Sequence, residues 1–176
     1  FWLLLKIQSV AFPSLCVDTL GANHNEPVGL YSCKSPYNLT KIEYRQTFTL
    51  RKHRDIAVEL SDNDCLDANH GRVLVYPCKF YQEHQYFRYD IDTMQIICGT
   101  VRENLCMDVD ESSKIIITST CDRKKKTQKW QWGFVNETMV RNWIEFGKEI
   151  LDYQEIVDLR NLKKNRKKKK TTRQEI

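Results

Sequence analysis

The feature that most constrains this fold is a pattern that occurs three times along the chain. Each copy has a Cys-x-Asp triplet, a second cysteine 13 to 17 residues after the first, and then a Gln-x-aromatic triplet. The Cys-x-Asp triplets begin at residues 16, 65 and 106, and the Gln-x-aromatic triplets begin at residues 46, 85 and 128. A unit of about 40 residues cannot bury its own apolar face, whereas three units around a pseudo-threefold axis can close a small barrel. The repeat therefore predicts one domain of three equivalent units.

Short strands separated by turns are the expected local structure of each unit. β-Branched and aromatic residues form strand-length runs at 73–76 and 115–118. Turn-forming residues interrupt the chain at 21–23, 69–71 and 110–113. No helical spacing of apolar residues occurs before about residue 138. We therefore predict an all-β domain, with the aromatic residues that end the Gln triplets in a shared core: Phe48, Phe87 and Trp130.

The cysteines follow the same repeat. Pairing the two cysteines within each unit would join Cys16 to Cys33, Cys65 to Cys78 and Cys106 to Cys121. Six cysteines allow fifteen connectivities, and we favour this one because it gives each unit the same bridge. The seventh, Cys98, is left over. The sequence contains no Cys-x-x-Cys motif and no tight Cys/His cluster, so we expect no metal site.

Several features bear on the cellular setting. Two N-glycosylation sequons begin at Asn38 and Asn136, and together with paired cysteines they favour the secretory pathway. The chain opens with Phe1 and not with Met, which we interpret as a segment of a longer protein. No run approaches the roughly 20 apolar residues that a membrane span needs, so we expect no transmembrane segment.

The C-terminal part of the chain differs from the repeats. Apolar residues at mixed three- and four-residue steps predict an amphipathic helix over 138–162, and the Lys-rich segment 163–176 predicts a disordered basic tail. Residues 160–176 hold nine basic and one acidic residue, which leaves 19 basic and 22 acidic residues in the remainder. We therefore expect no nucleic-acid partner, since such a domain needs clustered basic residues on its folded surface. The helix can pack on the barrel or dock another domain, and the tail can contact anionic glycans or lipid headgroups or stay solvated.

Three copies of Cys-x-Asp, aromatic-x-Cys and Gln-x-Trp/Phe over residues 15–134 resemble the ricin B lectin family, whose fold is a β-trefoil. More narrowly, CVDTLG at 16–21, VGLYSC at 28–33 and QTFTL at 46–50 look like the C-terminal lectin domain of polypeptide N-acetylgalactosaminyltransferases. The resemblance implies a β-trefoil over 1–137, with repeats at about 10–55, 56–96 and 97–137. It also implies that a catalytic domain precedes the lectin domain in such proteins. Manganese would belong to that absent domain, so we expect no catalytic residue and no cofactor in this chain.

Sugar recognition needs three kinds of group. A carboxylate accepts hydrogen bonds from two neighbouring sugar hydroxyls, an aromatic face stacks on the C–H patch of the ring, and a third polar group selects the epimer. The family fills these roles with the Asp of Cys-x-Asp, the aromatic residue two before the second cysteine, and an Asn just before the Gln.

By this resemblance the candidate carbohydrate-binding residues come from two repeats. They are Asp67, Tyr76 and His84 in the second repeat, ranked first, and Asp18, Tyr31 and Arg45 in the first repeat. The third repeat has Asp108, but it has Ser119 at the aromatic position and Thr127 at the Asn position. We therefore expect the third repeat not to bind sugar. His84 and Arg45 depart from the family Asn. The other reading of the three aspartates is that they only stabilise turns.

Two functional hypotheses follow. The first is a lectin module that recognises N-acetylgalactosamine (GalNAc) or galactose on O-glycosylated protein, as part of a glycosyltransferase in the Golgi lumen or as a secreted protein. Its partners would be GalNAc- or Gal-bearing glycopeptides, and a catalytic domain or another protein contacting 138–162. The alternative is a trefoil scaffold without sugar binding that acts through protein–protein contacts. A stand-alone enzyme has little support, because the chain has no Gly-x-Ser-x-Gly elbow and no Gly-rich phosphate loop.

Overall fold

The computed structural model describes residues 5–34, 44–51, 54–59, 61, 63–79, 82–99 and 103–133. The predicted helix over 138–162, the basic tail over 163–176 and the sequon residues Asn38 and Asn136 lie outside these residues. Within the part of the chain that is described, no helix has the length and hydrophobicity to span a bilayer.

The described chain folds into short strands, which confirms the all-β prediction. The strands are β1 (Lys6–Ser9), β2 (Leu15–Asp18), β3 (Gly29–Ser32), β4 (Phe48–Leu50), β5 (Ile56–Val58), β6 (Asp64–Asn69), β7 (Arg72–Pro77), β8 (Phe87–Asp90), β9 (Gln95–Cys98), β10 (Leu105–Val109), β11 (Ile116–Thr120) and β12 (Trp130–Gly133). Two single-turn 3-10 helices, η1 (Glu83–Gln85) and η2 (Lys126–Gln128), precede β8 and β12. The strands fall into three sets of four, one for each copy of the motif.

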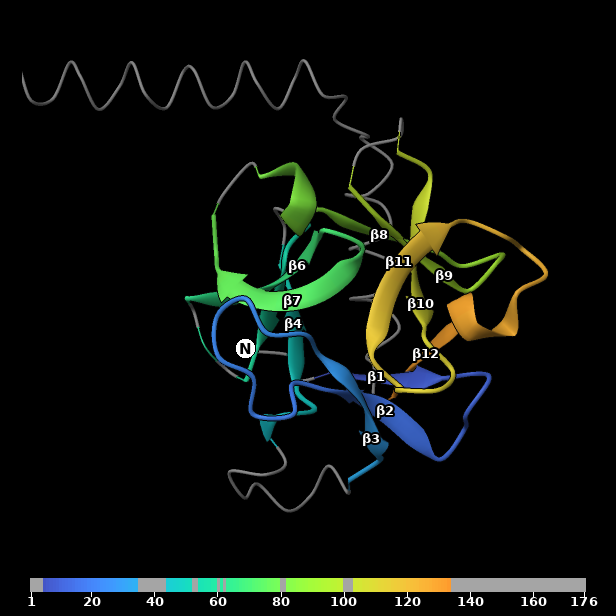
Figure 1. Ribbon diagram of the computed structural model, residues 1–176, viewed down its shortest axis with the longest axis horizontal. Coiled ribbons are helices and arrows are strands. Elements are labelled where there is room, and N and C mark those ends of the chain that lie inside the picture. The colour runs from blue at the N-terminus through green and yellow to red at the C-terminus, as the bar shows by residue number, and fades with distance from the viewer. Residues whose placement is uncertain are drawn as a thin grey trace, which may run out of the picture.

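Backbone hydrogen bonds link six strands in a ring, which forms the barrel, and Figure 1 shows one of its pairs, β1 and β12, side by side. Antiparallel ladders join β1 to β12, β4 to β5 and β8 to β9. Within each set, the first and fourth strands meet through one equivalent backbone hydrogen bond, which the core aromatic residue donates. These bonds run from Phe48 N–H to the Leu5 carbonyl (2.9 Å), from Phe87 N–H to the Arg54 carbonyl (2.9 Å) and from Trp130 N–H to the Met94 carbonyl (2.8 Å). The same contact between the first and fourth strands therefore occurs three times around the barrel, as the motif predicts.

The remaining six strands form three hairpins, β2–β3, β6–β7 and β10–β11, that contact one another in a ring. Backbone hydrogen bonds link Val28 to Val73, Thr118 to Gly71 and Leu30 to Lys114, at 2.8 to 3.0 Å. Each repeat therefore contacts both of its neighbours through its hairpin, and a loop of one repeat can reach the surface of the next.

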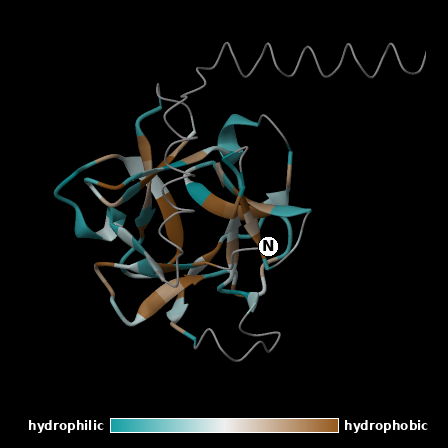
Figure 2. Cartoon of the chain, turned by 180° about the vertical axis from the view of Figure 1, so that it is seen from behind, coloured by the Kyte–Doolittle hydropathy of each residue, from teal (hydrophilic) through white to brown (hydrophobic). Residues whose placement is uncertain are grey.

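The core is made of equivalent positions from the three repeats. Residues at three such positions are 0 to 1% exposed: Ile7, Ile56 and Ile96; Val17, Leu66 and Met107; Phe48, Phe87 and Trp130. Figure 2 shows hydrophobic residues along the strands and hydrophilic residues in the outer turns. The Trp130 indole N–H donates to the Met107 carbonyl at 3.2 Å, so its polar atom is satisfied inside the core. Burying such a side chain stabilises the fold by about 1.5–3 kcal/mol, and the predicted role of the three aromatic residues is confirmed.

Three disulfides close the three hairpins with the predicted pairing: Cys16–Cys33, Cys65–Cys78 and Cys106–Cys121. In each, the Cα atoms lie 5.0 Å apart. Cys98 carries a free, buried thiol on β9. Burial, with a further contribution from the charge of Glu103, raises the pKa of the Cys98 thiol far above its usual range. A thiol that stays protonated in this way is a poor nucleophile.

Candidate functional site

One buried hydrogen-bond arrangement occurs in all three repeats and explains why Gln and Asp recur together. In the second repeat, the Gln85 side-chain amide donates to Asp67 Oδ2 (3.0 Å) and to the Pro77 carbonyl (3.0 Å). Its carbonyl oxygen accepts the backbone N–H of Lys79 at 2.7 Å. Gln46 makes the same three bonds with Asp18, Ser32 and Lys34, and Gln128 makes them with Asp108, Thr120 and Asp122. Each glutamine thus orients its aspartate and holds the segment after the second cysteine.

The aspartate of the second repeat differs from the other two in its second oxygen. Asp67 is 6% exposed, and its Oδ1 atom is buried without a hydrogen-bond partner among the residues that the structure describes. A buried acceptor of this kind costs about 1–3 kcal/mol until a donor reaches it. Asp67 also borders a cavity of about 250 Å³. The site is therefore short of hydrogen-bond donors and has room for a molecule that supplies them.

The cavity brings together the three candidate residues of the second repeat. Asp67 on β6, Tyr76 on β7 and His84 on η1 all line it. The single turn of η1 places His84 directly before the buried Gln85, the glutamine that donates to Asp67. Six further residues line the cavity: Asn25, Asn69, His70, Leu74, Lys79 and Gln82. Its volume is below the roughly 300–1,000 Å³ of pockets for drug-sized ligands, which suits a single sugar ring.

The neighbouring first repeat completes this cavity through the loop between β2 and β3. The backbone N–H of Asn25 donates to the Val75 carbonyl at 2.9 Å, and the Val75 N–H donates to the Glu26 carbonyl at 3.1 Å. His24 lies 2.7 Å from an Asp64 carboxylate oxygen, and its ring centroid is 6.2 Å from that of Tyr76. Reading each repeat separately missed Asn25, because no motif within the second repeat points to a residue of the first.

The first repeat uses both oxygens of its aspartate internally. Asp18 Oδ1 accepts the Leu20 N–H at 2.7 Å, and Oδ2 accepts the Gln46 amide at 3.0 Å. Tyr31 is half-exposed, at 51%. The Arg45 guanidinium packs so closely against Gly21 that an added Cβ there would lie 3.0 Å from Nη2. Asp18 therefore already caps a turn, and Arg45 covers part of this surface.

In the third repeat, groups of the same repeat already donate hydrogen bonds to both oxygens of the aspartate. Asp108 is fully buried, and its Oδ2 atom accepts hydrogen bonds from Ser119 Oγ and Lys125 Nζ, both at 2.5 Å. Its Oδ1 atom accepts the Val109 N–H at 2.8 Å. Burial acts to raise the pKa of Asp108, but the hydrogen bonds that it accepts, from Lys125 first and then from Ser119, Thr127 and the Val109 N–H, together outweigh burial and lower the pKa to about 2. Ser119 thus stands where an aromatic platform would be and helps to satisfy Asp108.

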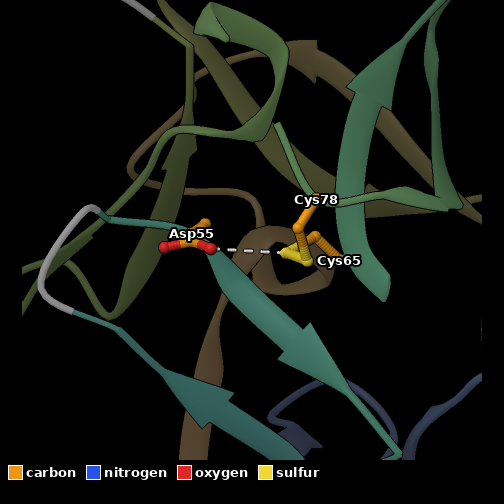
Figure 3. Close-up of side chains that lie close together, drawn as sticks. All are labelled: Asp55, Cys65 and Cys78. Atoms are coloured by element: carbon orange, nitrogen blue, oxygen red, sulfur yellow. Dashed lines mark hydrogen bonds between the residues drawn. A yellow bond between two sulfur atoms is a disulfide. The ribbon is translucent and has the colours of Figure 1, made fainter. Parts of the chain in front are cut away.

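A second cluster of polar and sulfur atoms lies between the start of β5 and the disulfide of the β6–β7 hairpin (Figure 3). Asp55 Oδ2 is 3.3 Å from Cys65 Sγ, which is bonded to Cys78. The Arg51 guanidinium pairs with the same carboxylate oxygen at 2.5 Å and donates to Cys65 Sγ at 3.1 Å. Although these ligand-type atoms lie within 4.8 Å of one another, a disulfide offers no thiolate and Arg51 neutralises the carboxylate. The cluster is therefore a buried ion pair on a disulfide and not a metal site.

Comparisons with known proteins agree with this architecture. Residues 4–130 match the sequence profile of the ricin-type beta-trefoil lectin domain. N-acetylgalactosaminyltransferase 4 of Drosophila melanogaster is 30% identical over 140 residues, which make up 76% of this chain and 21% of that protein. Polypeptide N-acetylgalactosaminyltransferase 8 of the same organism is 29% identical over 78% of this chain and 23% of its own length. The chain thus spans about a fifth of the length of the transferases that it matches.

Solved structures share the fold at low sequence identity. The structure of GalNAc-T7 with UDP, GalNAc and Mn²⁺ superposes with a TM-score of 0.57 and 20% identity, over 73% of this chain and 22% of that one. The β-trefoil lectin of the Vibrio vulnificus hemolysin/cytolysin, with N-acetyl-D-lactosamine bound, gives 0.60 and 16%, over 74% of this chain and 93% of that one. Both comparisons support a trefoil of three four-stranded repeats.

Proposed function

This chain belongs to the family of ricin-type β-trefoil lectin domains, and from this premise we propose that its second repeat binds GalNAc or galactose on O-glycosylated protein. Over the residues that it shares with the transferases this chain is a non-catalytic lectin module, because the similarity covers about a fifth of their length and falls on a lectin trefoil. Its ligands are therefore sought among carbohydrates.

The observation that carries the proposal is that Asp67 lines a cavity while its buried Oδ1 atom has no hydrogen-bond partner among the described residues. Two neighbouring sugar hydroxyls would donate to this carboxylate, and a hydrogen bond to a charged group contributes about 1.5–3 kcal/mol. Tyr76 would stack on the C–H patch of the ring. His84 would supply the third polar contact in place of the family Asn. Each of the three groups lines the same cavity.

The wider setting is part of the same proposal. The names of the transferase relatives and the three disulfides support a role in protein O-glycosylation in the Golgi lumen, or in a secreted protein. In this arrangement residues 1–137 form the lectin domain, and residues 138–162 contact a catalytic domain or another protein. The tail over 163–176 adds positive charge, and any manganese belongs to the catalytic domain.

A second candidate function is a scaffold that binds protein instead of sugar. The observation in its favour is that Asp18 and Asp108 already accept hydrogen bonds from the protein at both oxygens. In two of three repeats the aspartate therefore serves the fold. Deletion of 138–176 should then abolish capture of a partner while the trefoil stays folded, and capture that survives the deletion would contradict this candidate.

Ligand-observed NMR with a GalNAc-threonine peptide tests the leading proposal. We expect saturation transfer from the wild-type protein and from Asp18→Asn, and its loss in Asp67→Asn. Asp18→Asn is the matched control, since it makes the same charge change at the equivalent motif position. Losing one charged hydrogen-bond acceptor should weaken binding by roughly 10- to 100-fold. The absence of transfer from folded wild-type protein, even at millimolar peptide, would refute sugar binding, and loss in Asp18→Asn alone would move the site to the first repeat.

A further inference from the structure

A lysine lies against the aromatic platform in both repeats that have one. The Lys79 ammonium is 5.0 Å from the centre of the Tyr76 ring, and the Lys34 ammonium is 4.9 Å from the centre of the Tyr31 ring. An ammonium at this distance is attracted to the ring electrons. The third repeat lacks the platform and has an aspartate, Asp122, at the equivalent position.

The buried glutamine of each repeat determines where this lysine stands. The Lys79 backbone N–H donates to the Gln85 side-chain carbonyl at 2.7 Å, and the Lys34 N–H donates to that of Gln46 at 2.8 Å. The side chain therefore emerges beside the platform from a backbone that the sugar-site network already holds. Platform and cation occur together twice and are absent together once, so their pairing follows the architecture of the repeat.

Neither ammonium is neutralised within the described residues. The ion pairs there include those of His24 with Asp64, Arg51 with Asp55 and Lys125 with Asp108, and neither Lys34 nor Lys79 belongs to one. Lys79 is exposed and lines the same cavity as Asp67, Tyr76 and His84. Among the described residues, the lining of the cavity thus includes a carboxylate with one oxygen, Asp67 Oδ1, that lacks a donor, and an exposed ammonium, that of Lys79, that lacks an anion.

A ligand that satisfies both groups must carry hydroxyls and a negative charge on the same small molecule. A neutral sugar supplies donors to Asp67 but leaves Lys79 unpaired, and a simple inorganic anion would be repelled by Asp67. We propose that the second-repeat site binds sugars with an anionic substituent, a carboxylate or a sulfate ester, and that Lys79 contacts this substituent. The inference rests on the proposed sugar-binding function and adds the charge of the ligand. It is assigned to the second repeat because Asp18 in the first repeat is already engaged.

Calorimetric titration of the full chain with three probes tests this inference. The probes are GalNAc, its sulfate ester and sialylated GalNAc, so that the two sources of negative charge are compared with a neutral sugar. We expect an anionic probe to bind up to about five-fold more tightly than GalNAc at low salt, as befits one exposed ion pair. The preference should disappear at about 1 M salt, where the screening length falls to about 3 Å. A preference for only one anionic probe would identify which substituent the site accepts.

Two variants separate a contact at the site from a general effect of charge. Lys79→Gln should remove the preference, so that the variant binds GalNAc and the anionic probes with equal affinity. Lys124→Gln makes the same change in net charge on an exposed residue of the third repeat, and it should keep the preference. Equal affinities for neutral and anionic probes, or a preference that survives Lys79→Gln, would overturn the inference while the proposed function stands. Failure of the folded wild-type protein to bind any probe would overturn the proposed function as well.

Discussion

Replacing Lys125 by methionine tests whether its ion pair with the buried Asp108 stabilises the third repeat. The substitution keeps an unbranched apolar side chain and removes the ammonium that donates to Asp108 at 2.5 Å. Without it, burial still acts to raise the pKa of Asp108 and a main opposing hydrogen bond is gone. The pKa of Asp108 in the folded variant should therefore rise from about 2 toward its ordinary value of 3.8.

The size of the effect follows from the pKa shift. The pKa of Asp108 is lowered from 3.8 to about 2, and each pKa unit corresponds to about 1.4 kcal/mol, which gives an upper limit of about 2.5 kcal/mol. Lys125 is 43% exposed, so solvent screens the pair, and Ser119 contributes part of the shift. We expect the variant to lose about 1 kcal/mol of unfolding free energy near pH 7, a fall in Tm of a few degrees.

The pH dependence supplies the decisive measurement. The pKa of Asp108 is lower in the folded than in the unfolded protein, so its stabilisation is present above about pH 4 and is lost as the pH falls through about 2. In urea unfolding, the unfolding free energies of variant and wild type should therefore differ near pH 7 and become equal near pH 2. Lys124→Met, which removes a neighbouring exposed ammonium, should show no such difference. An equal loss at both pH values would refute the reasoning, because it would assign the effect to the aliphatic stem.

Three further predictions concern the second repeat. Gln85→Ala removes a donor to Asp67 and should cost about 2 kcal/mol; urea unfolding and sugar titration should both report a loss, and unchanged stability would contradict the role of Gln85. Gly71→Ala should cost only about 1 kcal/mol, because the backbone has φ +74° but no atom beyond Gly71 and its two chain neighbours lies within 4 Å of the new Cβ; a much larger cost in thermal unfolding would reveal a missed contact. Replacing Cys65 and Cys78 together by alanine opens a bridge between cysteines 13 residues apart and should cost about 3 kcal/mol. Denaturation that shows less than about 1 kcal/mol would mean that the hairpin is held without the bridge.

The parts of the fold that repeat three times were predictable from the sequence. A single Gln-x-aromatic triplet is weak evidence, but three copies in register with three cysteine pairs support one another, and each predicts the same position in a shared barrel. The disulfide pairing and the buried places of Phe48, Phe87 and Trp130 followed in this way. The sequence also gathered Asp67, Tyr76 and His84 into one candidate site, and the structure places all three around one cavity. Their role in binding sugar stays a prediction.

The motif could not predict which carboxylate oxygens of the three equivalent aspartates accept hydrogen bonds from the protein. Asp67 keeps an open oxygen, while Asp18 and Asp108 receive donors at both oxygens. The difference comes from side chains and loops outside the repeated pattern. Lys125 reaches Asp108 from 17 positions away along the chain, and Ser119 was predicted only as a missing platform.

The sequence by itself determined the number of repeats, their disulfides and which residue types stand at each motif position, because these depend on local spacing that recurs. Only the tertiary structure decided which carboxylate is left with an open oxygen, that Asn25 from the first repeat borders a cavity of the second, and that Lys79 lies against Tyr76. The physical reason is that hydrogen bonds and cavities depend on where separate segments meet in space. In this fold the ring of hairpins creates the contacts between repeats, and a sequence pattern within one repeat does not predict them.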